Sequence, residues 1–242
     1  MGLRCLQPPP CRAALVVACV AILAVSVPGT TAGVNARGAP PLQLGFDAAP
    51  IGAPWLDATA FGHWYSLHDG FGRTQVESAG AGRVLSLRTR VPPSADETFS
   101  SLVRTRQAFR NVDFDVAVRT VAQLRQPDAN PWEVGWLLWR YTDNAHFYSF
   151  IVKPNGWELA KQDGAYKGSQ RFLALSYAHS YAVGRQYRIR VRHVGATITV
   201  WVDGVRIVRY TDRERPYPSG SIALYAEDAA VRYGPVVLHR RS

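Results

Sequence analysis

Residues 132–163 read WEVGWLLWRYTDNAHFYSFIVKPNGWELAKQD and hold four of the seven tryptophans in the chain. Turn residues divide this stretch into three short runs of apolar residues. We expect Val134–Tyr141 to form the first strand, His146–Lys153 the second and Trp157–Gln162 the third. The Asn-Gly pair before the third strand is a strong hairpin signal, because both residues tolerate a positive φ. The stretch therefore predicts three consecutive antiparallel strands.

The first of these strands carries large side chains on both faces. Successive side chains of a strand point to opposite sides of the sheet, so Trp136 and Arg140 are expected to share one face. Such a strand is either buried in the centre of a sandwich or lines a groove where aromatic rings meet a ligand. Arg140 favours the groove, since a central strand rarely buries an arginine without a partner.

The chain from Val84 onward also reads as short strands separated by turns. Residues 111–121 and 187–192 alternate apolar and polar side chains, and Asp203-Gly204 is a two-residue hairpin turn between two further strands. No segment shows a helical period over three turns. Many evenly spaced strands predict an all-β sandwich or jelly roll. The remaining expected strands are 84–90, 101–107, 196–202, 205–210, 221–226 and 231–238.

Four segments of the chain resemble a known sandwich family. They are NVDFDVAV (111–118), GWLLWRYTDNAHFY (135–148), VRHVGATITVWVDG (191–204) and GSIALYAED (220–228). Their order resembles the concanavalin A-like, laminin-G-like domains of exported bacterial proteins. It is also similar to the 3-keto-disaccharide hydrolase domain and to sugar-binding modules of fructan-degrading enzymes. The resemblance covers about residues 46–238. It implies an all-β, concanavalin A-like jelly-roll sandwich of two antiparallel sheets, but no single activity, because many relatives only bind.

The N-terminal segment has the layout of an export signal. Arg4 and Arg12 precede or open an uncharged apolar run at 13–27, and small residues follow a Pro-Gly break. We expect residues 1–36 to be a signal peptide cleaved after Ala32 or Ala36. The alternative is an uncleaved membrane anchor, for which the run is short, since a span needs about 20 apolar residues. Residues 37–45 are then a linker and residues 46–242 the sandwich domain.

This layout predicts a protein that is secreted or held in the cell envelope. All three cysteines, Cys5, Cys11 and Cys19, lie in the signal segment. The mature chain is therefore expected to have no disulfide, no thiol nucleophile and no cysteine metal site.

The net charge of +10 comes almost entirely from arginine, because only three of the 28 basic residues are lysines. Codon bias in a GC-rich bacterium explains such a composition without any function. The functional alternative is an anionic partner at the cell surface, such as an acidic wall polymer. Nucleic acid is not expected as a partner of an exported chain.

The expected carbohydrate contacts lie on the three strands of residues 132–163. Aromatic rings stack on the apolar faces of sugars, and charged side chains bind the hydroxyls. Arg140 matches the Arg of the family's G-L-x-x-R strand and Tyr148 matches its Phe-Tyr pair, while Trp157 and Lys161 share a face of the third strand. The predicted sugar-binding residues are Trp136, Arg140, Tyr148, Trp157 and Lys161.

Catalysis stays open at the level of sequence. A laminarinase-type glycosidase of this fold needs a Glu-x-Asp-x-Glu strand, which the chain lacks, and it lacks a Gly-x-Ser-x-Gly elbow as well. An acid–base pair drawn from the acids around the aromatic stretch is the remaining route. The candidates are Glu133, Asp143, Glu158 and Asp163.

No cofactor is required by these motifs, although calcium is possible. Sandwiches of this type often bind it through carboxylates near the chain ends. The candidate ligands by position are Asp47, Glu227 and Asp228, and the alternative is that all three are exposed turn acids.

The sequence thus predicts an exported β-sandwich that binds carbohydrate without catalysis. One alternative is a glycoside-type hydrolase resembling the 3-keto-disaccharide group. Another is a structural or adhesion protein of the cell envelope.

Overall fold

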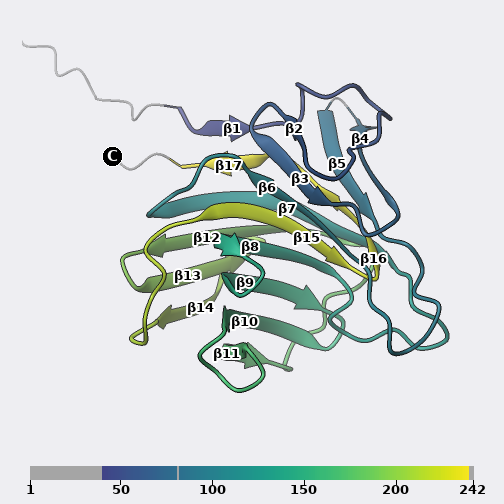
Figure 1. Ribbon diagram of the computed structural model, residues 1–242. Coiled ribbons are helices and arrows are strands. Elements are labelled where there is room, and N and C mark those ends of the chain that lie inside the picture. Colours follow the sequence, from purple (N-terminus) through teal and green to yellow (C-terminus); the bar gives the residue numbers. More distant parts are fainter. Residues whose placement is uncertain (1–39, 81, 240–242) are drawn as a thin grey trace, which may run out of the picture. The chain divides into compact units, whose positions relative to one another are not determined.

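The computed structural model describes residues 40–80 and 82–239, in which every secondary-structure element is a β-strand (Figure 1). The strands form two antiparallel sheets. The eight-stranded sheet contains, in spatial order, β11 (Gln170–Ser176), β10 (Gly156–Asp163), β9 (His146–Lys153), β8 (Gly135–Asp143), β15 (Ser221–Glu227), β6 (Ser100–Thr105), β3 (Trp64–His68) and β2 (Thr59–Phe61). No helix in the described part of the chain is long and apolar enough to cross a membrane.

The nine-stranded sheet packs against the first. Its main path contains β14 (Val205–Thr211), β13 (Thr197–Val202), β12 (Gln186–Val194), β7 (Val112–Gln123), β16 (Ala229–Tyr233), β5 (Gly82–Arg88) and β4 (Arg73–Ala79). At one side, β17 (Val236–Leu238) pairs with β7, and β1 (Leu42–Leu44) pairs with β17. The predicted all-β sandwich of two antiparallel sheets is confirmed.

Alternation decides which side chains lie between the sheets. In β12, Tyr187, Ile189 and Val191 are buried, whereas Arg188 and Arg192, at alternate positions, are exposed. The interior is filled by aliphatic and aromatic side chains from both sheets. Its largest fully buried aromatic residues are Trp55, Trp64, Trp139, Tyr148, Tyr233, Phe46, Phe114 and Phe150.

The predicted three-strand stretch forms β8, β9 and β10 in that order, as expected. Two other expectations are wrong. The single strand expected at 231–238 is two strands, β16 and β17, separated by Gly234 and Pro235. The Gly234 amide donates to the Ala117 carbonyl of β7. Part of the expected linker 37–45 is β1, whose Leu44 is buried in the core. The predicted signal peptide, residues 1–36, lies outside the described residues.

The outer face of the eight-stranded sheet carries an apolar cluster of its own. Leu102, Leu138, Tyr141 and Ala223 are buried there, although they do not face the interior of the sandwich. A sheet face that is exposed to solvent is normally polar, so the apolar cluster indicates a face that another group or molecule covers. The partly buried side chains around the cluster are Leu67, Trp136, Phe147 and Tyr225.

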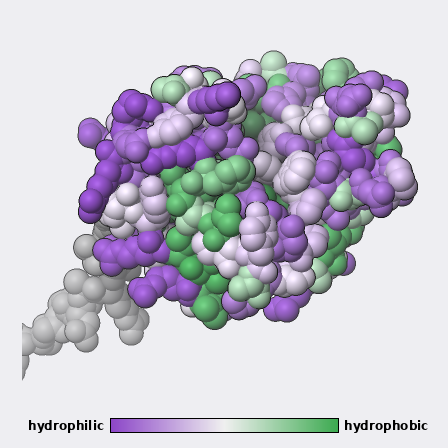
Figure 2. Space-filling view, turned by 90° about the horizontal axis from the view of Figure 1, so that it is seen from below, coloured by the Kyte–Doolittle hydropathy of each residue, from purple (hydrophilic) through white to green (hydrophobic). Residues whose placement is uncertain are grey.

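The lower edge of the sandwich in Figure 1 is formed by β11 and β14, which contact each other. From that side, hydrophobic residues gather in the middle of the face, with hydrophilic residues around them (Figure 2). Exposed apolar residues on these strands include Phe172, Leu175 and Val205. Phe172 lies in β11 and Tyr177 follows it. Both extend the apolar surface to the outer face of the eight-stranded sheet.

Candidate functional site

A groove crosses the outer face of the eight-stranded sheet. It consists of two adjoining hollows of about 470 and 250 Å³, which share Trp136, Gln170 and Glu227 as lining residues. The groove has an aromatic floor and polar groups around it. The other aromatic residues that line it are Trp132, Phe147, Phe172, Tyr177 and Tyr225. The other polar residues are Asn144, Lys153, Asn155, Glu158 and Gln162.

Trp136 and Tyr225 form the centre of the floor. They are direct neighbours across β8 and β15, and their rings meet edge to face with centroids 5.5 Å apart. The Trp136 indole N–H donates to the Trp132 carbonyl at 2.9 Å. Tyr233 of the other sheet holds both strands from below, since its buried hydroxyl lies 2.6 Å from the Tyr225 carbonyl oxygen and 3.1 Å from that of Trp136. Two aromatic rings are thereby fixed beside open space.

Two glutamates, Glu158 and Glu227, line the groove, and the carboxyl group of Glu227 is the more available to a ligand. It accepts a 2.7 Å hydrogen bond from the Tyr225 hydroxyl on the same face of β15. Burial raises the pKa of Glu227, and the hydrogen bond from Tyr225 only partly offsets this. The negative charges of Asp228 and Glu133 raise the pKa further. A carboxyl group with a raised pKa is a stronger base than an ordinary glutamate and keeps its proton to higher pH.

Glu158, across the groove from the β15 side, is already neutralised. Lys153 donates a short hydrogen bond to it, and both side chains are nearly fully buried. The Lys153 ammonium also lies 5.1 Å from the centre of the Tyr177 ring. The groove thus offers an ion pair at one side and a protonatable carboxyl group, Glu227, at the other.

Of the five predicted sugar contacts, only Trp136 lines the groove. The expectation that Arg140 shares its face is wrong, because β8 contains a bulge: three steps from Leu138 to Tyr141 match two steps of β15. Arg140 is the bulged residue, with φ +48°. Gly220 leaves room for it, since a Cβ there would lie 2.3 Å from the Arg140 carbonyl carbon.

The Arg140 side chain turns away from the groove and is buried. Its guanidinium group donates to the carbonyl oxygens of Arg110, Tyr217 and Gly195, which belong to three separate connecting segments. Burial lowers the pKa of Arg140. The arginine that suggested a ligand therefore has its partners within the protein.

Tyr148, Trp157 and Lys161 lie between the sheets and do not line the groove. Trp157 packs against Phe150 in the core, with ring centroids 6.0 Å apart. The Lys161 ammonium is fully buried, 3.0 Å from Asp212, and the Tyr148 hydroxyl donates to the same carboxylate at 2.6 Å. On β10 it is Glu158 and Gln162 that face the groove, so the prediction chose the other face of this strand.

The four predicted catalytic acids are not brought together. Glu133 is buried and paired with Arg125, Asp143 is exposed beside His146, and Asp163 pairs with Arg215. Glu158 alone lines the groove. The carboxyl group that faces it across the floor is Glu227, which the sequence suggested only as a metal ligand.

Two of the predicted calcium ligands, Asp47 and Asp228, lie beside arginines. Asp228 is fully buried, accepts from the Phe99 amide at 2.8 Å and pairs with Arg125 at 2.6 Å, so an arginine already neutralises it. Asp47 is exposed and lies 3.5 Å from Arg83. Within residues 40–80 and 82–239, no group of three or more His, Cys, Asp or Glu side chains could hold a metal ion. Calcium binding stays a prediction.

Sequence reasoning missed Tyr225, Glu227, Gln170 and Phe172 as groove residues. A signal was present for the first two. They lie two residues apart on a strand whose alternate positions, Leu224 and Ala226, are apolar, so they had to share the outer face.

Residues 58–236 match the model of a protein family described as the 3-keto-alpha-glucoside-1,2-lyase-like domain. A search of curated proteins gives no match.

Solved structures share the fold at low sequence identity. The carbohydrate binding module CBM66 from Bacillus subtilis is 13% identical, with a TM-score of 0.51 over 76% of this chain and 96% of that one. A glycoside hydrolase family 16 endo-glucanase from Bacteroides ovatus is 9% identical, with a TM-score of 0.52 over 73% and 94%. A laminarinase from Flavobacterium sp. UMI-01 is 8% identical, with a TM-score of 0.50 over 74% and 93%. The predicted concanavalin A-like jelly roll is confirmed.

Proposed function

Because the chain belongs to the 3-keto-alpha-glucoside-1,2-lyase-like domain family, a family of carbohydrate-active β-sandwiches, we propose that it binds a carbohydrate in the groove over β8, β10, β11 and β15. The observation that carries this proposal is the pair Trp136 and Tyr225, whose fixed rings form an apolar floor next to the polar groups of Glu227 and Gln170. A sugar ring has an apolar face and a rim of hydroxyls, and such a site complements both.

Binding is tested on the purified chain from residue 37 onward, with neutral glucans and α-glucosides as ligands. Trp136→Ala removes most of the floor, and we expect it to weaken binding ten- to a hundredfold, the usual range for a central aromatic contact. Phe71→Ala is the control, because Phe71 is an exposed aromatic residue between β3 and β4 that does not line the groove. Equal affinities for the two variants would place the site elsewhere.

A second candidate function is elimination on a 3-keto-glucoside, which the environment of Glu227 favours. The 3-ketone acidifies the hydrogen on C2. The Glu227 carboxylate takes up that proton, the electron pair forms the C1–C2 double bond, and the C1–O bond breaks. The leaving oxygen takes a proton from Lys153, the ammonium group on the other side of the groove. Both proton transfers need groups within hydrogen-bond reach of the substrate, as general acid–base catalysis requires.

Product analysis separates the candidate functions. A binder retains the glycan unchanged, whereas a lyase releases the aglycone from a 3-keto-glucoside and loses this activity in Glu227→Gln. A structural or adhesion protein of the envelope does neither. The starting expectation is binding without catalysis. Product release by the wild type that is lost in Glu227→Gln would establish the lyase.

We also propose export, on the strength of the N-terminal layout of residues 1–36. N-terminal sequencing of the protein from the culture supernatant should give a start at Gly33 or Arg37. An intact chain that begins at Met1 and stays in the membrane fraction would overturn this.

A further inference from the structure

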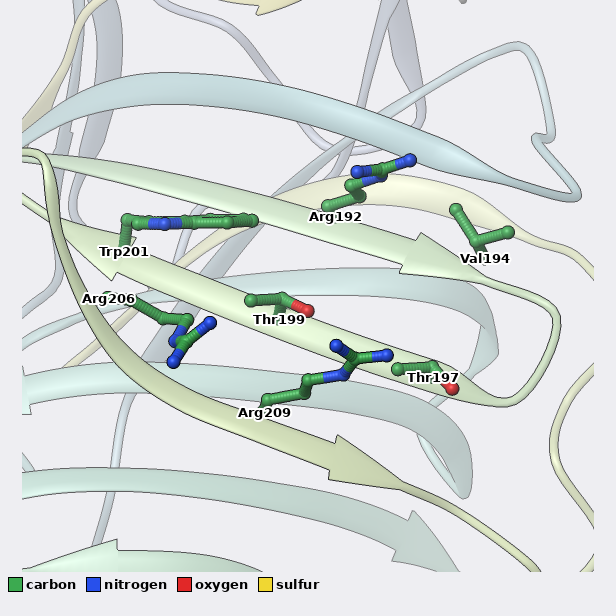
Figure 3. Close-up of a pocket in the computed structure, with 7 residues that line it drawn as sticks. All are labelled: Arg192, Val194, Thr197, Thr199, Trp201, Arg206 and Arg209. Atoms are coloured by element: carbon green, nitrogen blue, oxygen red, sulfur yellow. The ribbon is translucent and has the colours of Figure 1, made fainter.

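A separate hollow, of about 430 Å³, lies on the outer face of the nine-stranded sheet (Figure 3). Its lining comes from the three neighbouring strands β12, β13 and β14. The residues are three arginines, two threonines, one tryptophan and one valine: Arg192, Arg206, Arg209, Thr197, Thr199, Trp201 and Val194.

The strand register explains why the surface is hollow here. Arg192 of β12 lies opposite Thr199 of β13, which lies opposite Arg209 of β14. Two strands that flank a third are roughly 10 Å apart, so the two long side chains border a space above a short one. Trp201 borders one end of this space, beside Arg206 on the next strand. The hollow is thus a product of side-chain lengths in one cross-strand row.

The positive charge in this hollow is only partly balanced by carboxylates of the protein. On the β7 side, Asp113 binds Arg190 through two hydrogen bonds of 2.7 and 2.9 Å and lies 3.8 Å from Arg192. On the β14 side, Arg206 and Arg209 are exposed and have no carboxylate partner among the described residues. Positive charge therefore accumulates toward β14.

We propose that this hollow is a second binding site, for an acidic polysaccharide built of uronic acid units. A guanidinium group binds a carboxylate through two parallel hydrogen bonds, and Arg206 and Arg209 are free to do so. The hydroxyls of Thr197 and Thr199 can bond to sugar hydroxyls, and the Trp201 indole offers a ring for stacking. Arg190 holds that ring in place, with its guanidinium carbon 5.3 Å from the ring centre. The inference does not depend on the groove of the other sheet.

A uronic acid unit uses all three features, because it joins a carboxylate to a sugar ring with hydroxyls. A phosphate polymer needs only the arginines. A single-stranded nucleic acid would use the arginines together with stacking on Trp201. The choice between them is open to a direct test.

The test measures binding of the purified chain from residue 37 to polygalacturonate at low ionic strength, with neutral dextran, polyphosphate and single-stranded DNA as comparison polymers. The variant Arg206→Gln/Arg209→Gln removes the two arginines without partners. The matched control, Arg88→Gln/Arg119→Gln, removes the same charge from exposed positions of β5 and β7 on the same sheet. Trp201→Ala then tests the sugar-stacking part.

We expect the wild type to bind polygalacturonate and not dextran through this site. The Arg206/Arg209 variant should bind at least tenfold more weakly, the control within about twofold of wild type, and Trp201→Ala several-fold more weakly. Equal weakening by the two double variants would show diffuse charge without a site. Tighter binding of polyphosphate or DNA than of polygalacturonate, lost in the same variant, would overturn the assignment to acidic sugars. No binding of polygalacturonate would overturn the proposal entirely.

Discussion

The groove over the eight-stranded sheet and the polar network inside the sandwich contain the same kinds of residues. We define the interior network as Arg140, Tyr148, Lys161, His193 and Asp212. In the network, each charged group is hydrogen-bonded to other groups of the protein. Lys161, for example, donates to the Asp212 carboxylate and to the carbonyl oxygens of Glu214 and Arg215 at 2.7–3.0 Å. In the groove, Glu227 is bonded to one tyrosine hydroxyl, and the aromatic rings border open space.

The contrast shows that the partners of the charged groups, rather than residue type, separate a structural cluster from a binding site. The interior network holds residues 212–218 in place, which belong to the connection between β14 and β15. Tyr217 in that loop has its carbonyl bound by Arg140 and its ring 4.5 Å from the Lys161 ammonium. Buried charged groups of this sort must be paired to be tolerated.

The largest effect is expected for Lys161→Met. The substitution removes the ammonium group that lies 3.0 Å from the fully buried Asp212 carboxylate, and leaves Arg171, at 3.8 Å, as its ion-pair partner among the described residues. Breaking a buried pair in this way costs about 3–5 kcal/mol of unfolding free energy. Urea unfolding measures the loss. Lys167→Met is the matched control, because Lys167 is exposed and should change stability by less than about 0.5 kcal/mol. A loss below about 1 kcal/mol together with loss of glycan binding would mean that the network is the ligand site after all.

The next effect is a fall in stability with falling pH caused by His193. Burial and the nearby positive charge of Arg140 lower its pKa to about 3, while its Nδ1 accepts from the Trp139 indole at 2.9 Å. Below pH 6.5 the unfolded chain takes up a proton that the folded chain refuses. Stability from this residue is therefore full above pH 6.5 and falls by about 3 kcal/mol as pH drops to 4.

The variant His193→Asn isolates this contribution, since asparagine keeps an acceptor near the Nδ1 position and does not titrate. We expect its unfolding free energy to fall less between pH 6.5 and 4 than that of the wild type, by about 3 kcal/mol. His68 also has a pKa lowered by burial, so the difference between the two proteins is the relevant quantity. Parallel pH profiles would show that His193 titrates normally in the folded state.

Much of the fold was predictable because hydrophobic periodicity and turn residues act locally. The alternation in β7 and β12 and the turns before β10 and β14 place those strands correctly. The strands that sequence reasoning did not identify include β1 to β4 and β11. β1 and β2 have three residues each, and no residue of β11 is fully buried, so these strands carry little local pattern. β1 also pairs with β17, whose Leu238 lies 196 positions after its partner Leu42.

The candidate site was harder to predict, for two physical reasons. A bulge at Arg140 reverses the faces of β8 beyond it, and no local residue pattern announces a bulge that Gly220, 80 positions later, makes room for. An inward lysine on β10 looks like a ligand contact until its partner is known, and Asp212 lies 51 positions away in the sequence. Trp136 precedes the bulge, so it lies on the face that the alternation of β8 predicted.

Arg140→Gln tests whether the bulged residue Arg140 has a structural role rather than a role in glycan binding. It removes the charged donor of the three carbonyl oxygens that join separate loops, and we expect a loss of about 2–3 kcal/mol in unfolding free energy. Glycan binding at a temperature where the variant is folded should be unchanged. Arg213→Gln, at an exposed position in the same loop region, controls for loss of charge. Weaker glycan binding with intact stability would return Arg140 to the binding site.

The smallest effect on stability, and the one that separates the two regions most clearly, is expected for Glu227→Gln. A raised pKa means that folding disfavours the ionised carboxyl group, so its contribution to stability is greatest at low pH and is lost as pH rises through the folded pKa. Glutamine has the same shape, keeps an acceptor for the Tyr225 hydroxyl and carries no charge. At pH 7 the variant should therefore be as stable as the wild type or more stable by up to about 1 kcal/mol, the pattern of a residue kept for function at a cost in stability.

Urea unfolding at pH 7 measures this, and glycan binding or product release should weaken several-fold in the same preparation. Destabilisation like that of Lys161→Met, with function unchanged, would move Glu227 from the groove's chemistry to the scaffold.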